Sequence, residues 1–273
     1  MELALYEFPL AIVFAGVPLP GRTNPYIILL TPNPVVSIDV DVEESKTTST
    51  RIDGVRPGWR YDLAVKSFVD TLSARLEQPI KVNITVKVGE SVSYPPAASI
   101  YAATTLALVK SIADAAGYEL DQREVLDSAS SIDTEAGIGL DYIDGLREAM
   151  MLGKSIVYRK SEELIELGTG VRLEFELVGE EDIGEEAVEV LKEPLFSALT
   201  RLSGLAVVEA VKRLREYEAD VFRLVQRVDN AIFYLLYGAE TPRAECKWTP
   251  SLQRVYGICK PGTGLGDTIE FVL

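Results

Sequence analysis

The chain has 273 residues, of which 47% are hydrophobic and 25% are charged, so it can bury one large core or two smaller ones. Its formal net charge of −15, with a pI near 4.6, argues against nucleic acid as a partner, because that binding needs clustered Lys and Arg side chains. Histidine is absent, which excludes Ser-His-Asp and Cys-His catalytic arrangements and His-ligated zinc. Proton transfer must therefore depend on Asp, Glu, Lys, Tyr or Cys.

The two cysteines and the apolar N-terminal stretch bear on the compartment. Cys246 and Cys259 form no CxxC and are too few for a zinc site, so we expect small buried residues, with a disulfide as the alternative for a hyperthermophilic source. The stretch 3–20 lacks a basic flank and is interrupted by Glu7 and Pro9, which favours a buried strand over a signal sequence. No other run approaches the roughly 20 apolar residues of a membrane span. These patterns predict a cytoplasmic protein without membrane contact.

The first part of the chain, up to residue 116, combines strand and helix patterns. Apolar runs or period-two alternation predict strands at 11–14, 26–30, 36–42 and 80–88. The segment 43–58 is polar and contains a Gly54/Pro57 turn. Apolar residues at helical spacing predict helices at 61–75 and 98–116, the second opened by Pro95-Pro96 and closed by Gly117.

The rest of the chain begins with predicted helices at 119–130, with Asp121 as N-cap, and at 143–151. The predicted elements that follow are strands at 155–158 and 171–177, helices at about 183–192, 197–217 and 219–237, and strands at 255–259 and 268–272. This order indicates an α+β fold with two lobes, which we divide into 1–168 and 169–273.

A glycine-rich loop, Lys-Pro-Gly-Thr-Gly-Leu-Gly at 260–266, lies between the last two predicted strands. Gly262, Gly264 and Gly266 permit positive φ angles and close approach of an anion to backbone amides, as in a phosphate-binding nest. A glycine-rich hairpin turn explains the same residues equally well. The loop is not a Walker A sequence, because no Gly-Lys-Ser/Thr follows, and it is not a dinucleotide fingerprint, because a strand rather than a helix comes next.

Ala97, Ala98 and Ser99 are expected to open the helix that follows the strand 80–88. Backbone amides and the helix dipole favour anions at such a terminus. The Ser99 hydroxyl could contact a phosphate or Mg²⁺, and a plain capping role for Ser99 is the alternative.

Asp141 follows Gly137-Ile138-Gly139-Leu140 and begins a predicted helix. In a chain without histidine, a carboxylate here could orient or deprotonate a substrate hydroxyl. An N-cap role would explain Asp141 as well. Just upstream, Asp133 and Glu135 carry carboxylate oxygens of the kind that Mg²⁺ prefers.

In their order, these segments resemble the motifs of the GHMP kinase superfamily, which includes galactokinase, homoserine kinase, mevalonate kinases and archaeal pantoate kinases. Pro20-Gly21-Arg22-Thr23-Asn24 matches the first motif, Pro-Gly-Arg-x-Asn. Gly139-Leu140-Asp141 is similar to the setting of the catalytic Asp, and the loop 262–266 is similar to the third motif. The second motif, Gly-Leu-Gly-Ser-Ser-Ala-Ala, corresponds to 86–103, where no glycine occurs after residue 89.

The resemblance implies a two-lobed fold, with a mixed α+β N-terminal lobe and a ferredoxin-like C-terminal lobe, and a kinase of a small molecule that uses ATP and Mg²⁺. It assigns Asp141 and Arg22 to catalysis and Ser99 to the metal. Glu135 is a further candidate metal ligand, because it is a carboxylate just upstream of Asp141. The residues it assigns to nucleotide binding are Ala97, Ala98, Ser99, Gly262, Gly264 and Gly266.

Two functional hypotheses remain. The first is a kinase that phosphorylates a hydroxyl of an anionic metabolite such as pantoate, because 135–141 is similar to a segment of archaeal pantoate kinases; a related phosphomevalonate-type decarboxylase is its variant. The second is a protein with the kinase fold that has lost ATP binding and serves as a binding or assembly partner, which the glycine-free second motif supports. A homodimer is compatible with both.

Overall fold

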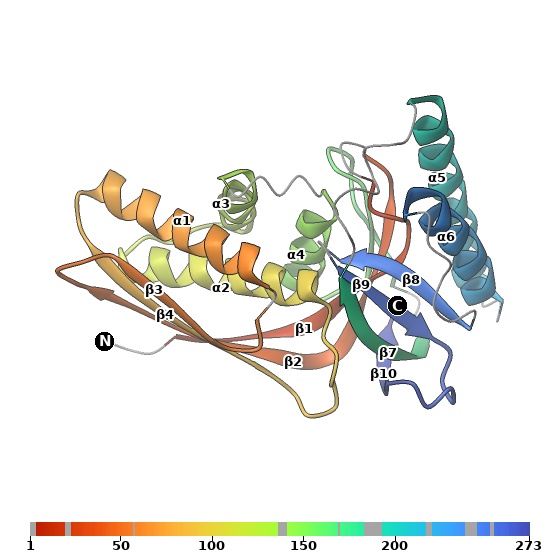
Figure 1. The fold of residues 1–273 in the computed structure, drawn as a ribbon, viewed down its shortest axis with the longest axis horizontal. Helices are drawn as coiled ribbons and strands as arrows, with labels where there is room; N and C mark the ends of the chain where they lie inside the picture. Colours follow the sequence, from red (N-terminus) through yellow and green to blue (C-terminus); the bar gives the residue numbers. More distant parts are fainter. Residues whose placement is uncertain are drawn as a thin grey trace. The chain divides into compact units, whose positions relative to one another are not determined.

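The computed structural model describes residues 4–19, 23–56, 58–135, 141–168, 170–182, 193–216, 220–237, 245–251 and 254–273. Contacts within the chain define two units (elements labelled in Figure 1). Unit 1 comprises Met1–Leu10, Asn33–Gly89 and Ala97–Gly139, and unit 2 comprises Ala11–Pro32, Glu90–Pro96 and Leu140–Leu273. Their boundary differs from the expected division at 168/169, because the first two strands each contribute residues to both units.

Unit 1 is a sheet with three helices on one of its faces, as Figure 1 shows. Its strands are the start of β1 (Ala4–Ala15), the end of β2 (Tyr26–Glu44), β3 (Ser49–Gly54) and β4 (Ile80–Val88). β4 pairs antiparallel with β2 and parallel with β3. The helices are α1 (Trp59–Leu76), α2 (Ala97–Ala115) and α3 (Gln122–Glu135).

The patterning of unit 1 explains these elements. Along β4 the alternate residues Ile80, Val82, Ile84 and Val86 are buried, as expected for a strand with one covered face. In α2, 15 of the 19 residues are buried, so it is the central helix of its unit. α3 begins with the predicted cap: the Asp121 side chain accepts from the Glu124 amide, and the Glu124 side chain accepts from the Asp121 amide, both at 2.8 Å.

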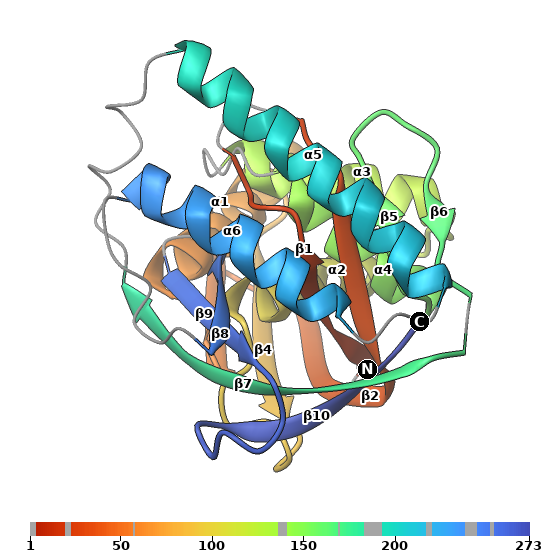
Figure 2. The ribbon, with the colours of Figure 1, turned by 90° about the vertical axis from the view of Figure 1, so that its right-hand side faces the viewer.

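Unit 2 is built on antiparallel strands in the order β2, β10, β7, β9, β8. The strands not yet defined are β5 (Ile156–Tyr158), β6 (Ile165–Glu166), β7 (Arg172–Asp182), β8 (Cys246–Ser251), β9 (Arg254–Cys259) and β10 (Asp267–Val272). β5 pairs with the start of β2, where Tyr26 is opposite Tyr158. The helices are α4 (Tyr142–Leu152), α5 (Glu193–Arg215) and α6 (Val221–Tyr237). Figure 2 shows α5 and α6 as neighbouring helices.

Two buried cross-links tie unit 2 together. A disulfide joins Cys246 and Cys259, which are opposite each other on β8 and β9 and fully buried. The ammonium of Lys247 lies 3.1 Å from the Asp229 carboxylate, and both side chains are fully buried. Lys247 also donates to the Val13 carbonyl at 2.9 Å, which links β8 to the end of β1. Burial lowers the pKa of Lys247 and raises that of Asp229, and their mutual attraction opposes both shifts.

The predicted elements are recovered with three differences. The strands expected at 26–30 and 36–42 are one strand, β2, whose exposed Pro32 and Pro34 lie where its pairing changes from β5 and β10 to β4. β3, β6 and β8 were not predicted, because β6 has only two residues and neither β3 nor β8 has an apolar run or a clear alternation. The helix expected at 183–192 lies outside the described residues.

Candidate active site

Asp141 lies immediately before α4 in unit 2, and its side chain makes no capping hydrogen bond to that helix. One carboxylate oxygen instead lies 2.9 Å from the Lys160 ammonium, and the other accepts from the Thr23 hydroxyl at 3.3 Å. The Asp141 side chain is 21% exposed. A carboxylate that is held by a cation, yet open to solvent, can meet a substrate hydroxyl, which a buried cap could not do.

Lys160 follows β5, and no motif pointed to it. Its side chain is 48% exposed, and its ammonium also lies 3.9 Å from Asp144 on the first turn of α4. The chain brings Lys160 to Asp141 because β5 pairs with the start of β2 and packs against α4. The sequence signal was only a lysine two residues beyond a predicted strand, which is too common to single out.

Asp144 and two tyrosines complete the electrostatics around Asp141. Asp144 accepts from the fully buried Arg147 guanidinium at 2.9 Å. Burial, together with the charges of Asp144, Glu148 and Asp141, raises the pKa of Tyr158, and burial with the Asp141 charge raises that of Tyr26. Both phenols therefore stay protonated at neutral pH and act as neutral groups.

The first motif contributes two residues: Thr23 contacts Asp141, and Asn24 lies in the core that supports Thr23. Asn24 is fully buried; its amide donates to the Val17 carbonyl at 3.1 Å, and its oxygen accepts from the Tyr26 hydroxyl at 2.9 Å. Asn24 thus fixes the backbone that carries Thr23. Arg22, predicted to act beside Asp141, lies outside the described residues.

The second-motif residues Ala97, Ala98 and Ser99 form the first turn of α2 in unit 1, as predicted, and their side chains are at most 3% exposed. Two residues further on, the Tyr101 hydroxyl donates to Asp133 at 2.7 Å. Asp133 is therefore engaged by a phenol. Glu135 ends α3, and its side chain lies outside the described part of the structure. Among the described residues, no three acidic or Cys side chains cluster in a way that could hold a metal ion.

The glycine-rich loop before β10 forms an anion nest, but the anion is a side chain of the chain itself. Glu176, on β7, accepts from the amides of Gly262 at 2.5 Å and Thr263 at 3.0 Å, from the Leu265 amide at 3.0 Å, and from the Thr263 hydroxyl. These hydrogen bonds, that of the Thr263 side chain first, lower the pKa of Glu176 to about 2. The amides predicted to bind a phosphate are thus engaged by a carboxylate.

Gly266 has a separate role, set by strand packing. A Cβ on Gly266 would lie 1.9 Å from the Leu177 carbonyl oxygen on β7, so no larger residue fits there. Gly262 and Gly264 have φ angles of +90° and +69°, which glycine adopts without strain. The hairpin-turn interpretation of these three glycines therefore accounts for their positions.

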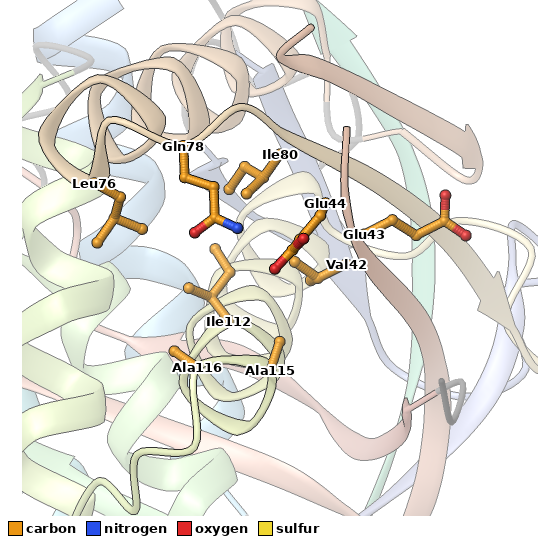
Figure 3. A pocket seen from close by; sticks show the side chains of 9 residues that line it. All are labelled: Val42, Glu43, Glu44, Leu76, Gln78, Ile80, Ile112, Ala115 and Ala116. Atoms are coloured by element: carbon orange, nitrogen blue, oxygen red, sulfur yellow. The ribbon is translucent and has the colours of Figure 1, made fainter. Parts of the chain in front are cut away.

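A hollow of about 590 Å³ lies in unit 1, at the end of α2 remote from Ser99. At about 1.5 Å per residue, Ile112 on its wall is roughly 20 Å along α2 from Ser99. In Figure 3, Glu44 and Gln78 direct polar groups into the hollow and Glu43 points away. The lining residues are Val42, Glu43, Glu44, Leu76, Gln78, Ile80, Ile112, Ala115 and Ala116. None of the predicted site residues is among them.

No family model and no curated protein matches the chain. Its structure is similar to that of mevalonate kinase from methicillin-resistant Staphylococcus aureus MRSA252, with a TM-score of 0.62 and 17% identity over 99% of this chain and 98% of that one. For Streptococcus pneumoniae phosphomevalonate kinase in complex with phosphomevalonate and AMPPNP, the TM-score is 0.60 and the identity 11%, over 94% of this chain and 92% of that one. For mevalonate pyrophosphate decarboxylase from Streptococcus pyogenes, the TM-score is 0.63 and the identity 10%, over 99% of this chain and 96% of that one.

All three proteins are members of the GHMP kinase superfamily. The chain therefore has the fold of that superfamily, and the predicted α+β class and the predicted resemblance are confirmed. At identities below 20%, this likeness establishes the fold alone, so an activity must be argued from the site.

Proposed function

We propose that the chain is an ATP-dependent phosphotransferase that acts on a hydroxyl group of a small anionic metabolite. The observation that carries the proposal is the Asp141–Lys160 pair, 2.9 Å apart and partly open to solvent, in a fold shared with mevalonate kinase. A carboxylate and an ammonium so placed provide the two charges that phosphoryl transfer to an anionic alcohol requires.

The roles follow from charge and hydrogen bonding. Asp141 would accept the hydrogen bond of the acceptor hydroxyl and take its proton as the new ester bond forms. Lys160 would pair with the negative charge of the metabolite, and Thr23 would hold Asp141 in position. Pantoate, mevalonate and phosphomevalonate all combine an alcohol with an anionic group, so each fits this arrangement.

Two of the predicted segments, the first turn of α2 and the glycine loop, differ in how well they suit nucleotide binding. ATP would supply the phosphoryl group, with Mg²⁺ neutralising part of its charge. The first turn of α2 is a suitable place for phosphate, since a helix N-terminus favours anions. The amides at 262–265 are bonded to Glu176, so we give the glycine loop no direct part in nucleotide binding. We assign that binding to the first turn of α2 and, because the Ser99 side chain is fully buried, to its backbone amides.

The test is release of ADP by the purified full chain with Mg-ATP and pantoate, mevalonate, phosphomevalonate, diphosphomevalonate, shikimate or homoserine. With the preferred acceptor, Asp141→Asn should lower kcat by about 10²–10⁴-fold. Lys160→Ala should mainly raise KM for that acceptor. Lys154→Ala is the control, because this half-exposed lysine of unit 2 pairs with Glu166 and not with Asp141. Equal activity of Asp141→Asn and the parent would refute the assignment.

A second candidate is a protein of this fold that binds partners without catalysis, and the Glu176 contacts favour it. A nest filled by an internal carboxylate, in a chain whose second motif has no glycine, would be a stable end point after loss of nucleotide binding. Titration calorimetry with Mg-ATP separates the two candidates. Binding with a Kd below about 1 mM supports the enzyme; no heat with ATP, together with no turnover of any acceptor, supports the second candidate.

A further inference from the structure

The outer face of α5 is unusually apolar for an exposed helix. Of the thirteen large hydrophobic side chains that are exposed among the described residues, six lie on α5 and its neighbour α6. On α5 they are Leu195 (39%), Leu202 (40%), Leu205 (69%) and Val208 (65%). Their spacing of seven, three and three residues places them along one side of the helix.

The opposite side of α5 already contributes to the core of unit 2. Phe196 and Leu199 pack with Ile232 and Leu236 of α6, and Val207 is fully buried. α5 is therefore apolar on two sides, and the described part of the chain covers only one of them. Figure 2 shows α5 as an outlying helix of its unit, with α6 beside it. Contiguous exposed apolar surface of this kind marks an interaction site.

The charges on α5 indicate which partner fits. Arg201 and Glu209 lie four residues before and four residues after Leu205, on the same exposed side. If two α5 helices pack antiparallel with Leu205 at the two-fold axis, Arg201 is level with the partner subunit's Glu209, and Leu202 is level with the partner subunit's Val208. The face is thus complementary to itself in charge and in apolar content, as an isologous interface requires.

The charge of the whole chain favours the same face. The chain carries −15, which repels a second copy at most orientations, but α5 has four basic and two acidic residues. Among the described residues, Glu209 pairs with Arg213 of its own helix at 2.9 Å, a partly exposed contact worth less than about 1 kcal/mol. It can therefore turn to a partner at little cost.

We infer that α5 is the contact face of a two-fold symmetric homodimer, with Leu205 at its centre and Arg201–Glu209 ion pairs on both sides. An anionic membrane is the competing occupant, because α5 is the one helix of the described residues long and apolar enough for a membrane span. The buried side of α5 and the charge of −15 both oppose that alternative. The inference is independent of the enzymatic proposal.

The test is the mass of the full chain in solution, by light scattering over a range of protein concentrations. We expect twice the chain mass of 30.0 kDa for the parent. Leu205→Glu should give a monomer that keeps the parental circular dichroism spectrum. Leu63→Glu, at a leucine of α1 that is also largely exposed (57%), should remain a dimer.

Charge exchange tests the register itself. Arg201→Glu should weaken the dimer by about tenfold or more in Kd, since it sets two pairs of like charges level with each other. The double variant Arg201→Glu/Glu209→Arg should recover most of the loss. A parent that is monomeric at every concentration, a dimer that survives Leu205→Glu, or a monomer that binds phosphatidylserine vesicles would each overturn the inference.

Discussion

Asn24 links three segments of unit 2 through one side chain. Its amide donates to the Val17 carbonyl and, at 3.3 Å, to the Ser203 hydroxyl on α5, while its oxygen accepts from Tyr26. All these groups are buried, so none can exchange its partner for water. Asn24 of the first motif is thus a structural residue, and any effect of Asn24 on substrate binding would be indirect.

Asn24→Ala should lower the free energy of unfolding by about 1–3 kcal/mol per buried group left without a partner. Tyr26→Phe removes only one of the hydrogen bonds of Asn24 and should cost less. Urea denaturation followed by fluorescence measures both. In the double variant the two losses should not add, because the Asn24–Tyr26 bond is absent from each single variant; full additivity would contradict the assigned contact.

Glu176 predicts how stability changes in acid. Its pKa in the folded chain is about 2, against an ordinary value of 4.5, so the folded state binds the proton less readily than the unfolded state. The contribution of the carboxylate is therefore complete above about pH 4.5 and is lost as the pH falls toward 2. Glu176→Gln should melt below the parent at pH 7, and the gap should narrow steadily between pH 4.5 and 2.

Calorimetric melting at half-unit pH steps measures that gap. Glu174→Gln is the matched control, since Glu174 is a more exposed glutamate two residues earlier on β7. A gap between parent and Glu176→Gln that stays constant with pH would show that the carboxylate charge is not what the loop binds. Nucleotide affinity of the same variant is informative too, because a loop released from Glu176 is free to accept another anion.

At the scale of elements, the sequence predicted what local pattern determines. The alternation of β4 and the small apolar residues of α2 suffice to define a half-covered strand and a central helix. β8 escaped prediction because Lys247 and Pro250 interrupt its apolar pattern. Its inward-facing lysine is tolerated because its ammonium pairs with Asp229, eighteen residues earlier, and donates to the Val13 carbonyl. A single sequence does not reveal such a pairing.

The candidate site divides in the same way. The catalytic role of Asp141 was predicted from the family resemblance of its surroundings, and Asp141 contacts Thr23 and Lys160 in the structure. Lys160 was missed because long-range contacts, the pairing of β5 with β2 and its packing against α4, bring it near Asp141. The glycine loop was interpreted as either an anion nest or a hairpin turn; the carboxylate that its amides bind, Glu176, lies 86 residues away in sequence from Gly262. Local sequence patterns predict which groups can bind or react, whereas long-range contacts determine which residues those groups contact.

The disulfide between β8 and β9 is a testable feature of that hairpin. It closes a short loop, since the cysteines are 13 residues apart. Removing a cross-link of this length should cost about 3 kcal/mol, mainly by restoring freedom to the unfolded chain. Cys246→Ala/Cys259→Ala, compared with the parent by urea denaturation, measures the loss. Since both cysteines are fully buried, a reductant should not reduce the disulfide of the native parent. It should reduce the disulfide once the chain unfolds in urea, and the urea midpoint of the parent should then fall.

At the scale of the molecule, the path of the chain determines what can fold alone. The chain passes between the units five times, after residues 10, 32, 89, 96 and 139. Pattern reasoning placed the division after residue 168 because a glycine-containing stretch and a new strand follow there. Contacts across a long sequence separation override that local signal, since β10 pairs with β2 through Val272 and Leu30.

A fragment of residues 169–273 should therefore fail to fold. It would lack the Val13 carbonyl that accepts from buried Lys247, and the Val13 amide that donates to the Tyr256 hydroxyl at 3.0 Å. It would also lack Val17 and Leu19, which pack against α5 and α6. Circular dichroism should show no cooperative melt for this fragment, and co-expression with residues 1–168 should restore one. A cooperative melt of 169–273 alone would instead support an independent C-terminal lobe, because the buried ammonium of Lys247 and the hydroxyl of Tyr256 would then need no partner from β1.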